Sequence, residues 1–138
     1  MKVLMIYMDR FAYRPTLKTL QDFPDNSEEW LFENVQVAFI QAEAEDQGED
    51  SVKSVEKKLL KNLKWIAGKN QTKKIVLHSF AHLSESKADP AFTKSFLDRI
   101  EERLVNTGYD VSQTPFGYFL ELDVKAPGHS LARVFKNF

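Results

Sequence analysis

The sequence predicts one α/β domain in which two main helices pack on a mixed β-sheet. Its 138 residues, 43% of them apolar, suffice for one hydrophobic core and are too few for two comfortable ones. Several short apolar runs have the continuous or alternating pattern of strands, whereas two longer segments repeat apolar residues every three or four positions, as helices do. The main elements follow in the order strand, strand, helix, strand, helix, strand, strand, which is typical of an α/β sandwich.

The N-terminal third contains the first predicted strands. Residues 3–8 (VLMIYM) are a continuous run of apolar β-formers, which predicts a strand that is buried on both faces and ends at Asp9. Residues 11–16 predict a shorter strand that pairs back on the first, and Pro15 indicates that this strand lies at an edge of the sheet or ends there. Loop signals follow until the next strong strand, residues 35–42 (VQVAFIQA).

The first helix follows an acidic stretch. Residues 43–50 predict a solvated loop, after which Ser51 caps the helix. The helix is predicted to end near Gly68, because glycine readily adopts the left-handed conformation of a helix C-terminus. Lysines occupy the face opposite the apolar residues, so the helix is amphipathic. The apolar positions are Val52, Val55, Leu59, Leu63 and Ile66.

The second helix begins at Asp89 and Pro90, a capping carboxylate followed by the residue best tolerated in a first turn. Gly108 is predicted to close it. Between the two helices, residues 75–79 (IVLHS) predict another buried strand. The apolar face of the second helix consists of Phe92, Phe96, Ile100 and Leu104.

Two strands are predicted near the C-terminus. Residues 118–125 (YFLELDVK) alternate between apolar and mostly polar side chains, which predicts a half-buried strand with Leu120 and Leu122 facing inward. Pro127 and Gly128 turn the chain, and residues 131–138 are predicted to pair back as a last strand.

Composition excludes several classes of protein. A net charge of −1 gives no overall attraction to nucleic acid or to an anionic membrane. The absence of cysteine excludes disulfides, thiolate nucleophiles and cysteine-based zinc sites, and it suits a reducing compartment. The apolar run at the N-terminus is too short for a signal peptide or a membrane span. We therefore expect a soluble, cytoplasmic protein with no membrane partner.

Catalytic motifs are scarce. The sequence contains no phosphate-binding loop, no nucleophile elbow and no helical zinc motif. His78 and His82 are four residues apart, but the first lies in a predicted strand, so the spacing loses its metal-binding meaning and we expect neither a metal nor a cofactor. His82 alone fits a loop histidine bonded to backbone groups. It also fits a binding site after a buried strand, where open α/β sheets hold ligands.

Two further features leave alternatives open. The aromatic turn at residues 116–119 (FGYF) fits core packing, the commoner use of such residues, or the wall of a pocket for a flat ligand. A basic patch lies on the outer face of the first helix and just after it. Most such faces are only solvated, and contact with RNA is the alternative. The patch consists of Lys57, Lys58, Lys61, Lys64, Lys69, Lys73 and Lys74.

Three motifs together carry a family resemblance. FAHLS at residues 80–84, PFGY at residues 115–118 and GHSLA at residues 128–132, in this order and at these separations, resemble the N-terminal editing domain of archaeal-type threonyl-tRNA synthetases. The resemblance runs over residues 1–138. It implies a fold shared with D-aminoacyl-tRNA deacylases, a homodimer, and hydrolysis of seryl-tRNA(Thr) without a metal or other cofactor. The implied partners are the aminoacylated 3′ end of tRNA(Thr) and, in a full-length enzyme, the remainder of the synthetase.

The resemblance also implies which residues form the site. His82 and Ala81 are the expected catalytic positions, at the aminoacyl end of the substrate. Bound water and backbone N–H groups would share the work, since no protein nucleophile is implied. The expected substrate-binding residues are Ala42, Phe80, Phe116, Gly117, Tyr118, Phe119, Leu120 and Arg133.

Some of these positions depart from the family pattern, which has Tyr-Lys where this chain has Phe119 and Leu120. Leu120 stands where the family has a lysine, and Arg133 stands where it has a glutamate. Three hypotheses therefore remain. The chain is an active deacylase that works mainly through backbone groups, His82 and water, or a degenerate module that binds tRNA or a partner without turnover. The third, a small-molecule-binding domain unrelated to tRNA, requires the resemblance to be coincidental.

Overall fold

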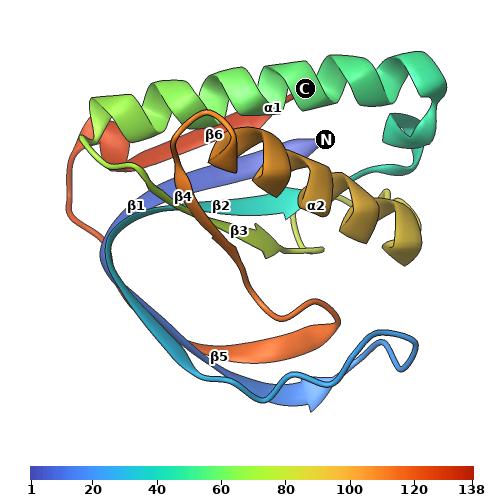
Figure 1. Ribbon diagram of the computed structural model, residues 1–138, viewed down its shortest axis with the longest axis horizontal. Helices are drawn as coiled ribbons and strands as arrows, with labels where there is room; N and C mark the ends of the chain where they lie inside the picture. The colour runs from blue at the N-terminus through green and yellow to red at the C-terminus, as the bar shows by residue number, and fades with distance from the viewer.

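The chain folds into a mixed β-sheet that carries two helices on one face (Figure 1). The computed structural model describes all 138 residues. Two short 3-10 turns, η1 (Ala44–Gln47) and η2 (Ser130–Ala132), accompany the main elements. Those elements are β1 (Lys2–Lys18), β2 (Trp30–Gln41), α1 (Glu49–Lys69), β3 (Lys74–Ser79), α2 (Pro90–Val105), β4 (Asp110–Gln113), β5 (Tyr118–Lys125) and β6 (Arg133–Asn137).

The sheet runs in the order β4-β3-β2-β1-β5, and β6 pairs with the first half of β1. β1 is antiparallel to its partners, whereas β2, β3 and β4 are mutually parallel. Ile40 of β2 lies opposite Ser79 of β3. The chain therefore leaves both strands at the same edge of the sheet, where parallel α/β sheets commonly build their sites.

The first strand is longer than predicted. The separate strand expected at residues 11–16 is wrong, because β1 continues through Asp9 without a turn. Near this point Asn34 has a positive φ of 53°, and Met8 and Phe11 face the same core cluster although regular alternation would separate them. The strand therefore bends instead of ending. Pro15 does lie at an edge, since pairing with β2 stops at Tyr13.

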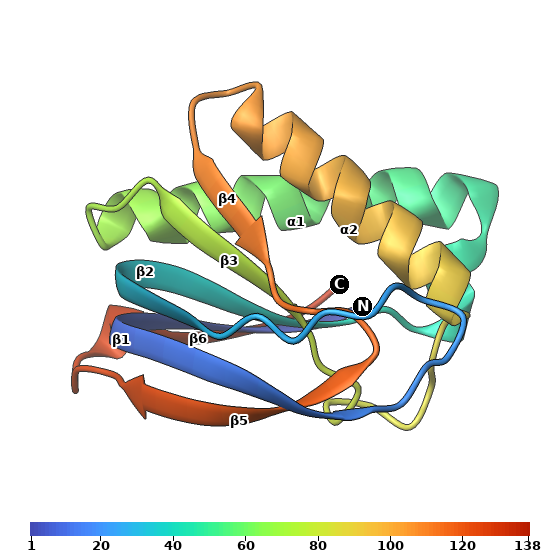
Figure 2. The same ribbon diagram turned by 60° about the horizontal axis from the view of Figure 1, so that its bottom comes forward.

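The bend divides the sheet into two layers. β1 and β2 curl away from the helices, and β5 with the outer half of β1 forms a lower layer (Figures 1 and 2). One core cluster packs the helices on the upper layer, and it includes Leu59, Ile66 and Phe96. A second cluster fills the curl, centred on Phe11 and Val37. The apolar faces predicted for both helices are thus confirmed as core.

The ends of α1 differ from the prediction. Gly48 occupies the N-cap position that was expected for Ser51. At the other end Gly68 stays helical, and the left-handed residue is Gln71, with φ 56°. Asn70 fixes this end because its side-chain amide donates to Gln36 Oε1 (2.9 Å) and to the Leu131 carbonyl (3.0 Å).

The ends of α2 agree with the prediction. Asp89 is the N-cap residue and Pro90 the first helical residue, although the Asp89 side chain forms no capping hydrogen bond. Gly108 has a φ of 95°, as expected of the residue that closes the helix. Neither α1 nor α2 combines the length and the apolar composition needed to cross a bilayer.

The acidic stretch before α1 is not simply a solvated loop. Glu43 and Asp46 are buried, and both carboxylates contact the α-amino group of Met1, at 2.8 and 3.1 Å. Lys2 adds a further contact to Glu43 at 3.1 Å. The charge pattern predicts exposure, but an ammonium group buried nearby reverses that outcome because it supplies the partner that a buried carboxylate needs.

The C-terminal strands depart from the prediction in three ways. β4 is an additional strand, and β6 pairs with β1 instead of β5. β5 is also more exposed than a half-buried strand, since Leu122 is 38% and Val124 47% exposed and only Leu120 joins the core cluster. No helix covers this layer, so alternation along β5 does not produce a buried face.

Candidate functional site

Two adjoining cavities lie where β2 and β3 end. The inner one, about 340 Å³, reaches from Ala42 to Thr93 at the start of α2, and the outer one, about 290 Å³, reaches from His78 to Leu122 on β5. The site thus spans both layers of the curled sheet. The wall common to the two cavities consists of Thr19, Leu20, Ser79, Ala81, His82, Phe116 and Phe119.

Nine of the ten predicted site residues line these cavities. Arg133 is the exception: it starts β6, and its guanidinium donates to the Pro127 carbonyl at 3.0 Å. The inner cavity is lined by Ala42, Ala81, His82, Phe116 and Phe119, and the outer cavity adds Phe80, Gly117, Tyr118 and Leu120.

The turn after β3 contains two backbone N–H groups that have no partner in the protein. Neither Ala81 N–H nor His82 N–H forms a hydrogen bond within the protein, whereas the preceding Phe80 N–H donates to the Ile40 carbonyl at 2.9 Å. Both side chains are exposed. Two adjacent unbonded N–H groups and an imidazole therefore belong to a turn that lines both cavities.

A buried glutamine holds this turn in place. Gln41, 3% exposed, accepts from the N–H groups of Leu83 (2.6 Å) and Ser84 (2.7 Å) through its side-chain oxygen. Its nitrogen donates to the carbonyls of Ser84 (2.7 Å) and Ser86 (2.9 Å). One side chain thus satisfies four backbone groups of a loop that has no secondary structure of its own.

Glu43, two residues after Gln41 and beyond the end of β2, secures the same loop. Its carboxylate accepts from Ser84 Oγ at 2.7 Å while it contacts the Met1 amine and Lys2. Burial alone would raise the pKa of Glu43, but hydrogen bonds from the Met1 amine, Ser84 and Lys2 outweigh it and lower the pKa to about 2. Glu43 is therefore ionised at neutral pH and links the site loop to the N-terminus.

The two imidazoles near the site differ in environment. His78 is buried, and its Nδ1 lies 2.8 Å from Thr114 Oγ1. Burial, with a smaller effect of nearby His82, lowers the pKa of His78 to about 4, so this ring is neutral at pH 7. The Phe80 ring lies between them, 5.7 Å from His78 and 4.9 Å from His82. The sequence relates His78 only to metal binding, through its four-residue spacing to His82, and does not predict its contact with Thr114.

The aromatic turn both packs and lines the site. Phe116 packs edge-on against Phe23 at 4.8 Å and contacts the helix core. Tyr118 Oη accepts from Asn26 N–H at 3.1 Å, which ties the turn to the loop between β1 and β2. Phe119 is 53% exposed at the rim. The alternatives of core and pocket are thus combined in one turn.

Gly117 has a φ of 82°, and a Cβ there would lie 3.0 Å from Leu20 Cβ. Gly117→Ala is expected to lower the free energy of unfolding by about 2 kcal/mol, because it combines left-handed strain with a clash against an atom fixed to the backbone. Gly108→Ala is the matched control, since φ there is 95° and a Cβ would meet nothing within 4 Å. It should cost about 1 kcal/mol. Equal losses in urea denaturation would show that the Leu20 contact is unimportant.

Several lining residues were not found from the sequence. Thr19 and Leu20 belong to the β1–β2 loop, which has no repeating pattern, and Lys87 and Thr93 flank the start of α2. Gln41 stood directly before the predicted Ala42. The position of Gln41 inside a predicted buried strand is a usable signal, because a buried glutamine side chain requires hydrogen-bond partners.

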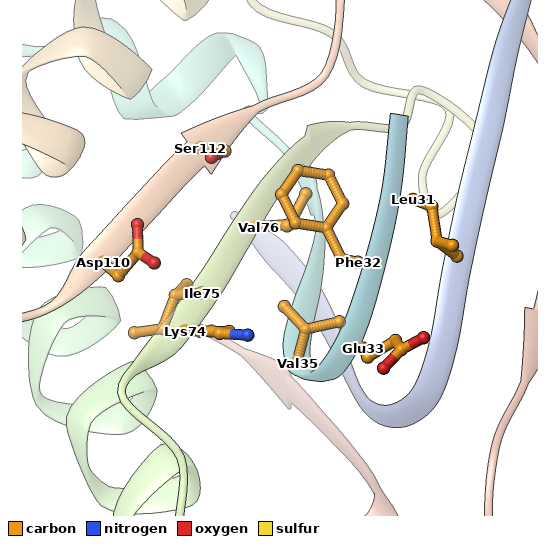
Figure 3. A pocket seen from close by; sticks show the side chains of 9 residues that line it. All are labelled: Leu31, Phe32, Glu33, Val35, Lys74, Ile75, Val76, Asp110 and Ser112. Atoms are coloured by element: carbon orange, nitrogen blue, oxygen red, sulfur yellow. The ribbon is translucent and has the colours of Figure 1, made fainter. Parts of the chain in front are cut away.

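A separate pocket of about 300 Å³ opens at the opposite end of the sheet, between β2 and β4 (Figure 3). Phe32, Val35 and Val76 form its apolar floor, and Lys74 and Asp110 flank it. None of the predicted site residues lines it. Of the three family motifs, FAHLS and PFGY contribute residues to the cavities at the ends of β2 and β3, whereas GHSLA contributes none.

Comparison with known proteins identifies the family of the chain. The family described as the archaea-specific editing domain of threonyl-tRNA synthetase matches residues 1–138. The chain belongs to this family. Among its relatives, the threonine–tRNA ligase of Hyperthermus butylicus is 33% identical over 144 residues, and that of Thermococcus kodakarensis is 31% identical over 137 residues. These matches cover 100% and 97% of the chain, but only 23% and 22% of the two ligases.

A solved structure matches this editing domain in fold. The c-Myc DNA unwinding element binding protein superposes with a TM-score of 0.70 over 100% of this chain and 99% of its own, at 12% sequence identity. The predicted fold class is confirmed: one α/β domain of the D-aminoacyl-tRNA deacylase type, with a mixed sheet and two main helices.

Proposed function

We propose that this editing domain hydrolyses the ester of mischarged seryl-tRNA(Thr), releasing serine and tRNA. The observation that carries the proposal is the turn after β3, where the unbonded N–H groups of Ala81 and His82 adjoin a cavity and Gln41 fixes the backbone. Donors held in place before the reaction stabilise a developing oxyanion without reorganisation, which is commonly the largest single contribution to acyl-transfer catalysis.

The reaction needs no protein nucleophile. A water oxygen attacks the ester carbonyl carbon, the carbonyl oxygen becomes an oxyanion facing the two N–H groups, and the bond to the ribose oxygen breaks. The leaving ribose oxygen takes up a proton that the water gives up, so atoms and charge balance. His82, exposed at the cavity, orients the attacking water. The backbone of the turn holds the carbonyl.

Substrate binding divides between the two cavities. The inner cavity, with Ala42 and Thr93 in its wall, receives the seryl group. In the outer cavity, Tyr118 and Phe119 flank the terminal adenosine, because aromatic side chains stack on bases. A hydrolytic site for serine is useful since a synthetic site for threonine gains only about 1–3 kcal/mol from the extra methyl group and cannot strongly reject serine.

A second candidate function rests on Leu120. This side chain lines the outer cavity and offers no hydrogen-bond donor where the family has a lysine. If hydrolysis requires the family lysine, the domain binds tRNA, or another partner, without turnover. Family membership sets aside the third hypothesis, a small-molecule-binding domain unrelated to tRNA.

The test compares ester hydrolysis of seryl-tRNA(Thr) and threonyl-tRNA(Thr) by the wild type and by His82→Ala. We expect selective loss of serine from its tRNA, slowed about 10-fold by His82→Ala, within the range of general acid–base contributions. His129→Ala is the matched control, because His129 is exposed and lines neither cavity. Tight tRNA binding without hydrolysis by the wild type would favour the second candidate. Equal rates for the two histidine variants would remove His82 from the mechanism.

A further inference from the structure

The outer face of α1 carries six lysines, which we call the lysine face. The residues of α1 that face the core are Val55, Leu59, Leu63 and Ile66, among others. At 100° per residue, the lysines lie on the opposite side of the helix axis. From Lys53 to Lys69 they extend over seventeen residues, a rise of about 24 Å along the helix axis. The lysine face consists of Lys53, Lys57, Lys58, Lys61, Lys64 and Lys69.

These lysines have no carboxylate partners. None of them takes part in an ion pair, and the one acidic residue between Ser51 and Lys69, Glu56, is turned toward Arg99 (3.0 Å) and Arg103 (2.9 Å) on α2. Elsewhere on the protein, basic side chains commonly do pair with carboxylates. The paired ones are Lys2, Arg10, Arg14, Lys18, Lys94, Arg99 and Arg103. Positive charge is thus left uncompensated on this face in a chain of net charge −1.

An exposed tryptophan lies within the lysine face. Trp65 is 42% exposed, although tryptophan is usually well buried. Lys58, Lys61, Trp65 and Lys69 are spaced by three and four residues, so they form a single line along the helix. A solvated lysine face does not need an aromatic ring in its middle. A surface that contacts ribose and phosphate uses both kinds of side chain.

α1 leads away from the candidate site. The chain passes from Ala42, in the wall of the inner cavity, through η1 directly into α1, and α1 then runs to the opposite end of the sheet, where β3 starts (Figure 1). The exposed carboxylates of Glu45, Glu49 and Asp50 come first on this path, and the lysine face starts after them at Lys53. A polynucleotide whose end occupies the cavity therefore meets the lysine face beyond this acidic stretch.

We propose that the lysine face and Trp65 bind the sugar–phosphate backbone of tRNA outside its 3′ end. This deepens the proposed function and rests on it for the identity of the RNA. The lysines neutralise phosphates, so binding depends strongly on salt. Between Lys61 and Lys69, the Trp65 ring packs on the sugar–phosphate backbone of the RNA. The contact carries no sequence information and acts by positioning.

The test is equilibrium binding of uncharged tRNA(Thr) transcript, followed by fluorescence anisotropy over a series of salt concentrations. Lys61→Glu with Lys69→Glu is expected to raise Kd about 10-fold near 0.1 M salt and to reduce the slope of log K against log salt by about 1 to 2. Lys125→Glu with Lys136→Glu is the matched control, with the same change in charge at exposed, unpaired positions on β5 and β6. It should leave the slope unchanged. Trp65→Ala should weaken binding and keep the slope.

Binding does not require hydrolysis, so this test is separate from that of the proposed function. If the wild type hydrolyses no ester but the lysine variant shows a reduced slope of log K against log salt, RNA binding by the lysine face is supported and the proposed hydrolysis is rejected. An unchanged slope in the α1 variant, or equal losses in both double variants, would overturn the surface. Binding of polyglutamate that depends on the lysine face, with none of tRNA, would also overturn it in favour of an acidic protein partner.

Discussion

Gln41→Ala is expected to slow hydrolysis of seryl-tRNA(Thr) by about 100-fold. The side chain bonds four backbone groups in the turn between Leu83 and Ser86, and alanine bonds none of them. The turn that carries Ala81 and His82 then loses its fixed position. A shift of about 1 Å in a catalytic group is enough for a loss of this size. The measurement is kcat for ester hydrolysis, together with KM for the aminoacylated tRNA.

Gln36→Ala is the matched control. Gln36 is also a buried glutamine of β2, but its side chain bonds Asn70 at the far end of α1, and it lines neither cavity. Both variants should lose about 1–3 kcal/mol of unfolding free energy, the cost of unsatisfied buried polar groups. Only Gln41→Ala should lower kcat. If the two variants lose activity in proportion to stability, Gln41 has no role in positioning the turn.

Glu43→Gln is expected to lower the free energy of unfolding at pH 7 by about 3 kcal/mol. The pKa of Glu43 is lowered from 4.5 to about 2 in the folded protein, and each unit corresponds to about 1.4 kcal/mol. Because the folded pKa lies below the unfolded one, this stabilisation is complete above about pH 4.5 and is lost as the pH falls toward 2. The difference between wild type and Glu43→Gln should shrink over the same range. Urea denaturation at several pH values measures it.

Glu56→Gln provides the comparison for Glu43. Burial opposes ionisation of Glu56, but hydrogen bonds from Arg103 and Arg99 prevail and lower its pKa as well. Glu56 lies away from the site loop, so its replacement should reduce stability without affecting hydrolysis. Glu43→Gln should reduce both, because Ser84 Oγ and the Met1 amine contact different carboxylate oxygens and the amide retains only one acceptor oxygen. A stability difference for Glu43→Gln that persists unchanged at pH 2 would contradict the role assigned to its ionised carboxylate.

Regular elements could be predicted from periodicity and from glycine and proline positions. The helices, the buried strands β2 and β3, and the closing role of Gly108 all follow from patterns within fewer than twenty residues. The bend in β1 could not be predicted, because Asp9 and Arg10 look like the end of a strand until their partners on β2 are known. β4 has the sequence DVSQ, which has too little apolar alternation to reveal a strand.

The candidate site was predictable only in part. Short motifs give the turn after β3 and the aromatic turn, because their residues are close in sequence. The loop residues Thr19 and Leu20 have no such signal and reach the cavity through the fold alone. Burial of Glu43 depends on the α-amine of Met1, 42 residues away in the chain. The pattern of charges along the sequence does not predict such a distant contact.

The curl of the sheet has a consequence for selectivity. One side of the site, from Ala42 to His82, belongs to the layer beneath the helices, and the other, from Leu20 to Phe119, belongs to the lower layer. These layers are joined through the bent strands β1 and β2, and Asn34, with its positive φ, lies at the bend. The shape of the candidate site therefore depends on the curvature of the backbone as well as on the side chains that line it.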